Sequence, residues 1–179
     1  MTTRTNSLLA IAACGLLAVS LTAGGQDSRR RSDTDAKLPS SVTLARKPRA
    51  KVIDGYRAMA RLAHQHGRID GRVDFDTMPF AELRRLLIGE GVIDDGWGFT
   101  PMAGLERDVL AYMAASYLDI RPGLLTSIFG MTRRYSYREL QHRGMMVQGQ
   151  PRQVVSGSEL LSVLTRVAAE TDRRGMGLQ

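Results

Sequence analysis

The sequence predicts a mainly α-helical protein in which helix–loop–helix units, with short extended loop segments, pack into one small helical domain. Apolar residues recur at helical spacing in several segments between residues 51 and 170. Glycine and proline residues separate these segments and mark helix ends. One pattern of helix end, loop and helix start also recurs after about 50 residues, which is typical of stacked helical units. An N-terminal signal or anchor helix and a disordered linker precede the domain.

Residues 1–25 have the layout of a secretory signal peptide. Arg4 precedes an apolar run from Leu8 to Ala23, and two glycines follow it. The run is shorter than the about 20 apolar residues that a membrane-spanning helix needs. These features predict an exported protein of the periplasm or cell surface, whose leader is either removed or retained as a membrane anchor.

Cys14 is a candidate lipidation site, because it follows Ile11-Ala12-Ala13 in an arrangement that resembles the lipobox of bacterial lipoproteins. The apolar run continues beyond Cys14, whereas a lipoprotein normally turns polar there, so ordinary cleavage further along the chain is the other alternative. Cys14 is the only cysteine of the sequence. Cleavage after it would leave no thiol for a disulfide, a nucleophile or a metal site.

Residues 26–50 are predicted to form a disordered basic linker, because Ser, Asp, Arg and Pro are frequent there and apolar periodicity is weak. The formal net charge of the chain is +7. Residues 24–50 hold seven basic and three acidic residues, whereas residues 51–179 hold 17 basic and 15 acidic residues. The folded part is therefore nearly balanced in charge, which argues against nucleic acid as a partner. Membrane contact is expected only through the N-terminal segment.

The helical domain is expected over residues 51–170, with a frayed tail at 171–179. Apolar residues on one face define each helix, and a cap or a glycine marks its ends. Asp54 is expected to cap the first helix, and Ser156 and Glu159 form a capping box before the last one. The expected helices cover about 55–65, 80–89, 105–119, a short segment ending near Gly130, 132–144 and 159–169.

The recurring pattern begins with a glycine at a helix end and leads through a loop to an apolar pair. In the first copy, Gly91-Val92-Ile93 leads to Val109-Leu110. In the second copy, Gly144-Met145-Met146 leads to Leu160-Leu161. Two copies are recognisable, and they are expected to stack because one such unit cannot bury its apolar face alone.

Residues Phe75–Leu118 resemble the S-layer homology (SLH) module, which occurs on bacterial surface proteins. That family shows a Phe-x-Asp-like start, a Gly-Ile-like pair after the first helix, a Gly-x-Phe-x-Pro loop and a Leu-Thr-Arg-Ala-Glu-like start of the second helix. Here Phe75-Asp76-Thr77-Met78-Pro79 resembles the start and Gly91-Val92-Ile93 the middle pair. Phe99-Thr100-Pro101 is similar to the loop, and Leu105-Glu106-Arg107 stands at the second helix start.

The resemblance implies a noncatalytic binding or anchoring module for cell-wall or surface material, in a family whose members usually work as three modules around a common axis. In that family the arginine at the helix start helps to bind an anionic cell-wall polysaccharide, a role that would fall to Arg107. The alternative is that this arginine only holds the turn, paired with Glu106, Asp108 or Asp95. Trp97 is a candidate stacking platform or a buried residue. Arg107, Trp97 and Asp95 are therefore the candidate ligand-binding residues.

No metal or cofactor site is expected. His64 and His66 are two residues apart, so on a helix their side chains diverge and cannot converge on one ion. The segment Asp70–Asp76 imitates part of a calcium-binding loop, but the surrounding sequence lacks carboxylates at the positions that calcium requires.

Two other functions stay open. The Met- and Tyr-rich helix faces would suit a structural subunit or scaffold that binds another envelope protein. Glu90, Asp94 and Asp95 could instead act as acid and base in a small wall-glycan hydrolase, although adjacent aspartates in a glycine-containing turn usually serve turn geometry. The expected partner is therefore a cell-wall polymer or an envelope protein, and the sequence does not define the oligomeric state.

Overall fold

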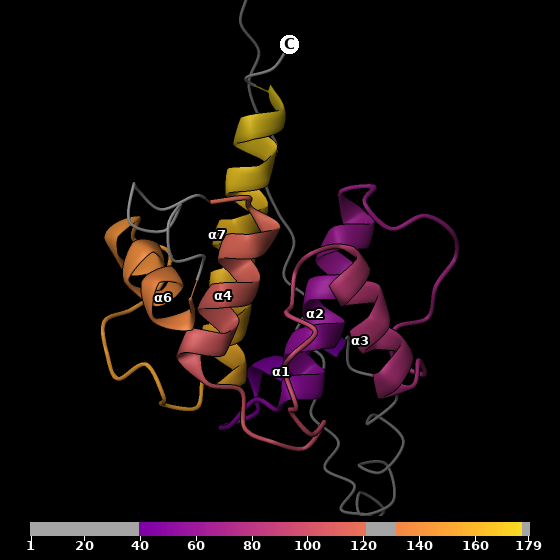
Figure 1. Ribbon diagram of the computed structural model, residues 1–179, viewed down its shortest axis with the longest axis horizontal. Helices are drawn as coiled ribbons and strands as arrows, with labels where there is room; N and C mark the ends of the chain where they lie inside the picture. The colour runs from indigo at the N-terminus through magenta and orange to yellow at the C-terminus, as the bar shows by residue number, and fades with distance from the viewer. Residues whose placement is uncertain (1–39, 121–131, 177–179) are drawn as a thin grey trace, which may run out of the picture. The chain divides into compact units, whose positions relative to one another are not determined.

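The computed structural model describes residues 40–120 and 132–176, and it confirms the mainly helical fold class (Figure 1). Six helices lie in this described part of the chain, which contains two isolated backbone bridges but no sheet. None of the described helices has the length and apolar character needed to cross a membrane. The leader, Cys14 and the short helix expected near Gly130 lie outside the described residues. The helices are α1 (Ser40–Ala45), α2 (Val52–Gln65), α3 (Phe80–Gly89), α4 (Arg107–Tyr117), α6 (Arg133–His142) and α7 (Gly157–Met176).

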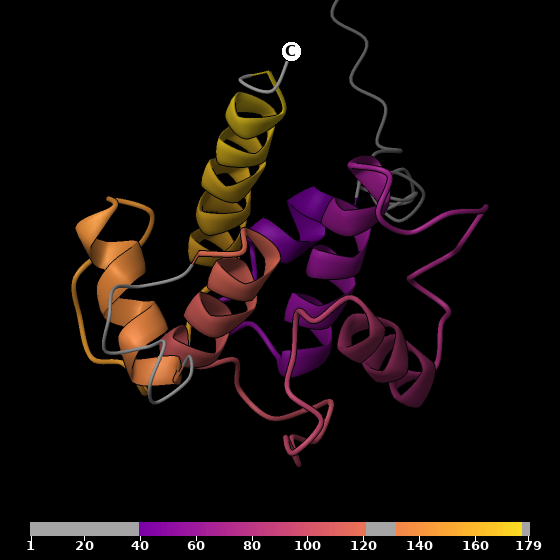
Figure 2. The same ribbon diagram turned by 45° about the horizontal axis from the view of Figure 1, so that its top comes forward.

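Three of these helices, α2, α4 and α7, contact one another, and each carries one further helix against it. α3 packs on α2, α6 packs on α4, and α1 packs on α7. Figures 1 and 2 show α4 lying against both α6 and α7, with α3 beside α2. The hydrophobic core joins all three central helices. Its largest fully buried side chains include Tyr56, Met59, Leu110, Met113 and Leu160.

Three backbone segments, one before each central helix, meet in a closed ring of hydrogen bonds. The N–H of Ala50 donates to the carbonyl of Val155 (2.8 Å), and the N–H of Val155 donates to that of Leu105 (2.9 Å). The N–H of Leu105 donates to the carbonyl of Ala50 (2.9 Å), which closes this backbone ring. The ring relates three units, α1–α2, α3–α4 and α6–α7. The sequence pattern identified two copies, and the structure adds a third.

This additional unit lies partly in the segment predicted to be a disordered linker. Within residues 26–50, Ser40–Ala45 form α1, Leu44 is buried in the core and Ala50 belongs to the backbone ring. The expected linker boundary at residue 50 is therefore wrong for residues 40–50. α1 has only six residues, which is less than two helical turns. A segment this short does not show a clear helical repeat of apolar residues, so the sequence pattern did not reveal it.

The backbone ring also decides where the central helices begin. The sequence predicts that the third helix starts at Leu105, but both the N–H and the carbonyl of Leu105 are used in the ring, so α4 begins at Arg107. Asp54 caps α2, as predicted, but from the third position inside the helix and not from the position before it. Its Oδ2 accepts the N–H of Lys51, the residue before the helix, at 2.9 Å, as in a capping box.

Two predicted helix ends and one predicted helix start are confirmed. Gly91 and Gly144 both have φ +68°, the left-handed conformation that ends α3 and α6 at little steric cost for glycine. Ser156 Oγ accepts the N–H of Glu159 at 3.1 Å at the start of α7, which is half of the predicted capping box. The carboxylate of Glu159 binds elsewhere, as described below.

The last helix is longer than its sequence pattern predicts. α7 continues to Met176, into the segment 171–179 that is expected to be frayed. Two contacts of its final turns explain the difference. Thr171 Oγ1 donates to the carbonyl of Val167 at 2.9 Å, and the guanidinium of Arg174 donates to the carbonyl of Leu118 at the end of α4.

Candidate functional site

Arg107, the predicted ligand-binding arginine, takes part in an ion pair between two units. It opens α4, and its Nε and Nη2 donate to the two carboxylate oxygens of Glu159 in α7 at 2.6 and 3.1 Å. Its Nη1 donates to Oε1 of Gln153 at 2.6 Å. The side chains of Arg107 and Glu159 are only 11% and 16% exposed, and their hydrogen bond raises the pKa of Arg107. Arg107, Gln153 and Glu159 form the arginine clamp.

The backbone N–H groups at the start of α4 are also used, in addition to the side chain of Arg107. The N–H groups of Arg107 and Asp108 donate to the carbonyls of Gln153 (3.0 Å) and Pro151 (2.9 Å), so they are not free to bind an anion. Glu159 is none of the three carboxylates predicted as partners, because it follows much later in the chain and is brought close only by the fold. A ligand role for Arg107 stays a prediction, and it would require the clamp to open.

Asp95 and Trp97 contact different groups from those of the clamp. The side chain of Asp95 is 81% exposed and pairs with Arg84 of α3 at 3.1 Å. Trp97 is half-buried and packs edge-on against Phe99, with 5.3 Å between ring centroids, and against Tyr112 of α4 at 4.9 Å. The three predicted site residues therefore have separate partners.

The other carboxylates of the predicted hydrolase site are also committed to local contacts. Glu90 Oε2 pairs with Arg68 Nε at 3.2 Å. Asp94 Oδ1 accepts the N–H of Gly96 at 2.7 Å, which closes the glycine-containing turn. Neither contact indicates acid–base catalysis, so a hydrolytic role stays a prediction.

The histidines and the calcium-like loop bind backbone and side-chain groups nearby. His64 and His66 each place Nδ1 against a backbone carbonyl, at 2.8 and 2.9 Å. Asp74 accepts hydrogen bonds from the N–H of Asp76 and the hydroxyl of Thr77, which lower the pKa of Asp74. Within residues 40–120 and 132–176, no group of three or more His, Cys, Asp or Glu side chains is placed to hold a metal ion.

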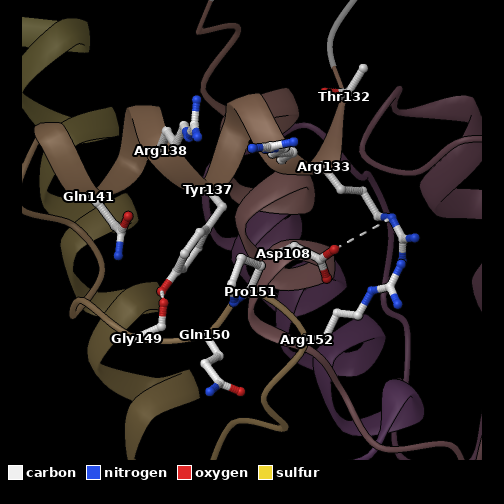
Figure 3. Close-up of a pocket in the computed structure, with 11 residues that line it drawn as sticks. Asp108, Thr132, Arg133, Tyr137, Arg138, Gln141, Gly149, Gln150, Pro151 and Arg152 are labelled. Carbon is white, nitrogen blue, oxygen red and sulfur yellow. Dashed lines mark hydrogen bonds and ion pairs between the residues drawn. The ribbon is translucent and has the colours of Figure 1, made fainter.

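A pocket of about 790 Å³ lies between the start of α4, helix α6 and the loop before α7 (Figure 3). Sequence reasoning did not identify it. Four of its lining residues are arginines, three from α6 and one from the loop, and we name it the arginine pocket. It is lined by Asp108, Thr132, Arg133, Arg134, Tyr137, Arg138, Gln141, Gly149, Gln150, Pro151 and Arg152.

Local hydrogen bonds fix the walls of this pocket. Thr132 Oγ1 accepts the N–H of Tyr135 at 3.4 Å and caps the start of α6. The hydroxyl of Tyr137 donates to the carbonyl of Gly149 at 2.9 Å, which holds the loop against the helix. Figure 3 shows this hydroxyl beside Gly149 and the Asp108 carboxylate on the side of Arg133 and Arg152.

The arginine pocket holds more positive charge than its own carboxylate can neutralise. Arg133 contacts two carboxylates: its Nε lies 3.8 Å from Asp108 Oδ2, and its Nη1 lies 3.8 Å from Glu106 Oε2, which is outside the pocket lining. The side chains of Arg134, Arg138 and Arg152 form no hydrogen bond or ion pair with any described residue. Arg133 and Arg152 line the same pocket (Figure 3). Such an arrangement can bind a carboxylate or phosphate group.

Part of this site has a sequence signal. Arg134 and Arg138 are four residues apart, so they lie on one face of α6, and no acidic residue stands four positions from Arg134 to balance them. Arg152 and Asp108 come from a loop and another helix. Their positions depend on the packing of α6 against α4, which sequence spacing does not provide.

No protein-family model, curated protein or solved structure matches this chain. The SLH resemblance therefore stays a prediction.

Proposed function

We propose that this chain is a noncatalytic, exported cell-envelope protein whose SLH-like domain binds an anionic wall or surface polymer through the arginine pocket. The observation that carries this proposal is the set of guanidinium groups at Arg134, Arg138 and Arg152, which have no partner among the described residues. The binding residues are thus neighbours of Arg107 and do not include it, because its donors are used in the clamp.

The physical chemistry of guanidinium groups supports an anionic ligand. Each group presents a planar fork of N–H donors that matches the oxygens of a carboxylate or phosphate. Arg133 and Arg152 line the same pocket, so their charges repel, and a bound anion would relieve this repulsion. A pocket lined by four arginines and one carboxylate keeps a net positive charge, which raises the local concentration of negatively charged polymer segments.

The three-unit architecture supports the SLH-like part of the proposal. Modules of that family usually work as three around a common axis, and the backbone ring joins three helix–loop–helix units of this chain. The arginine pocket lies where the second and third units meet, between α4 and α6 with the loop before α7. Export is supported by the layout of residues 1–25. Mass spectrometry of the mature N-terminus tests this part of the proposal.

The binding test is co-sedimentation with purified bacterial cell wall, together with affinity measurements for polygalacturonate, a carboxylate polymer, and for neutral dextran. We expect wall and polygalacturonate binding, no dextran binding, and weaker binding as salt rises. Replacing both Arg138 and Arg152 with Gln should reduce polygalacturonate affinity roughly tenfold or more.

The matched control replaces Arg143 and Arg173 with Gln. It makes the same change in net charge outside the arginine pocket, because these two residues pair with Glu139 and Glu170. Equal losses in the two double variants would show that only net charge matters. Failure of the wild-type protein to sediment would contradict the proposal and favour the scaffold function.

A further inference from the structure

The arginine pocket contains one acidic residue that simple anion binding does not need. Asp108 lies in the first turn of α4, lines the pocket and is only 7% exposed. Its Oδ1 is enclosed and has no hydrogen-bond partner among the described residues. Its Oδ2 lies 3.8 Å from Arg133 Nε, which is an ionic contact but too long for a hydrogen bond.

A carboxylate in this state is unusual for a folded protein. Buried carboxylates normally accept hydrogen bonds, because the removal of water from the charged group is costly. The attraction to Arg133 offsets only part of this cost, since the pair lacks a hydrogen bond and one oxygen is left over. Because Oδ1 is enclosed, a ligand in the pocket would reach the carboxylate through Oδ2, and a hydrogen bond donated to Oδ2 would supply what the protein does not.

The charge of the pocket indicates which kind of ligand group would donate the hydrogen bond to Asp108. Four arginines and one carboxylate line the pocket, so an ammonium group on the ligand would be repelled by the net positive charge, whereas a neutral hydroxyl would not. The separation of 3.8 Å between Asp108 Oδ2 and Arg133 Nε places the two recognition groups side by side. A ligand that binds both must therefore carry a hydroxyl and an anionic oxygen on neighbouring atoms, as an acidic sugar does.

We propose that Asp108 is a specificity-determining residue that accepts a ligand hydroxyl, while Arg133 and Arg152 bind the ligand's carboxylate or phosphate. This inference rests on the proposed function, because it requires an anion in the arginine pocket. The negative charge of Asp108 lowers the affinity of the pocket for every anion. A ligand with a suitably placed hydroxyl recovers part of this affinity through its hydrogen bond to Asp108. The pocket thereby selects acidic sugars over anions that lack hydroxyl groups.

Calorimetric titration of the purified protein with two matched pairs of probes tests this selectivity. D-glucuronate is compared with cyclohexanecarboxylate, and glucose 1-phosphate with cyclohexyl phosphate, so each pair keeps its anionic group and differs in hydroxyls. The wild-type protein should prefer the hydroxylated member of at least one pair by roughly tenfold. The pair that shows the preference tells whether a sugar carboxylate or a sugar phosphate is recognised.

Asp108→Asn, which preserves the shape of the side chain, should bind the hydroxyl-free anions several-fold more tightly and reduce the preference to below roughly threefold. Asp108→Ala serves as a second variant that also removes the acceptor oxygen, and thermal unfolding checks that both fold. Glu139→Gln is the control, because it removes a carboxylate of α6 that pairs with Arg143 outside the pocket.

The outcomes separate this inference from the proposed function. Equal binding of both members of each pair by the wild-type protein would overturn the role of Asp108 and leave the anion site in place. An unchanged preference in both Asp108 variants would overturn it as well. If none of the four probes binds, both the inference and the proposed function fail.

Discussion

The arginine clamp and the arginine pocket use the same chemical group in neighbouring parts of the domain, yet they satisfy it in opposite ways. In the clamp, the guanidinium of Arg107 donates to Glu159 and Gln153 and is largely buried. In the pocket, the side chains of Arg134, Arg138 and Arg152 have no partner among the described residues. An arginine at a helix start is therefore a ligand-binding candidate only while its donors are free.

Gly149 links the two regions. Its carbonyl accepts the hydroxyl of Tyr137 in the pocket wall. A methyl group on Gly149 would overlap Nη1 of Arg107, so a side chain at this position would have to displace either the clamped guanidinium or the loop. The pocket and the clamp therefore use different arginines, but the same loop residue, Gly149, contacts both of them.

The largest expected effect comes from breaking the clamp. Arg107→Met should lower the free energy of unfolding by about 3 kcal/mol, because it leaves the mostly buried carboxylate of Glu159 without its partner. Polygalacturonate affinity should stay within about threefold of wild type. Urea unfolding and affinity measurements on the same protein provide the two values. A stable variant that no longer binds would instead make Arg107 a ligand-binding residue, as the sequence resemblance implies.

A smaller effect is expected where the two regions touch. Gly149→Ala should cost about 2 kcal/mol of stability, since the new methyl group must displace either Arg107 or the loop. Thermal unfolding measures this cost. Combined with Arg107→Met, the substitution should cost much less than it does alone, because the obstructing guanidinium is then absent. Additive losses would show that the strain lies elsewhere in the loop.

The pocket should show the reverse pattern. Arg152→Gln is expected to lower anion affinity roughly tenfold, which corresponds to about 1.4 kcal/mol of binding free energy. Its effect on unfolding should stay within about 0.5 kcal/mol, because this exposed side chain has no partner in the described structure. Titration with polygalacturonate and urea unfolding test both parts. A large loss of stability would mean that Arg152 has a structural role like that of Arg107.

The smallest effect should come from an ordinary surface pair on α6. Glu139→Gln removes the partner of Arg143, whose Nε lies 2.7 Å from Glu139 Oε1. Exposed pairs at this spacing contribute less than about 0.5 kcal/mol, so unfolding should hardly change. Anion affinity should also stay close to that of wild type. A loss of unfolding free energy as large as that expected for Arg107→Met would show that buried and exposed arginine pairs contribute equally to stability.

Elements with a strong local signal could be predicted from the sequence. The apolar spacing of Leu83 and Leu87 located α3 closely, and Gly91 and Gly144 marked helix ends that the structure confirms. The helix starts were less accurate, because the backbone ring fixes them through hydrogen bonds between distant segments. The short helix α1 was missed for a related reason, since its packing on α7 and not its own pattern holds it in place.

The candidate site could be predicted only in part. The sequence pointed to an arginine near the start of α4, but the partner of Arg107 is supplied by α7 in the next unit. Arg134 and Arg138 share a helix face that spacing reveals, whereas Arg152 and Asp108 join them only when α6 packs on α4. Charge complementarity between distant segments is therefore the information that a single sequence lacks.

The backbone ring imposes a condition on the order of folding. Ala50 and Val155 are hydrogen-bonded neighbours although most of the described chain separates them. Until Val155 arrives, the buried N–H of Ala50 and the carbonyl of Leu105 have no acceptor or donor from the ring. The polypeptide must consequently be synthesised almost to its last helix before the domain can close. Because the ring joins segments that are far apart in the sequence, assembly should be cooperative and slower than that of a helical protein with only local contacts.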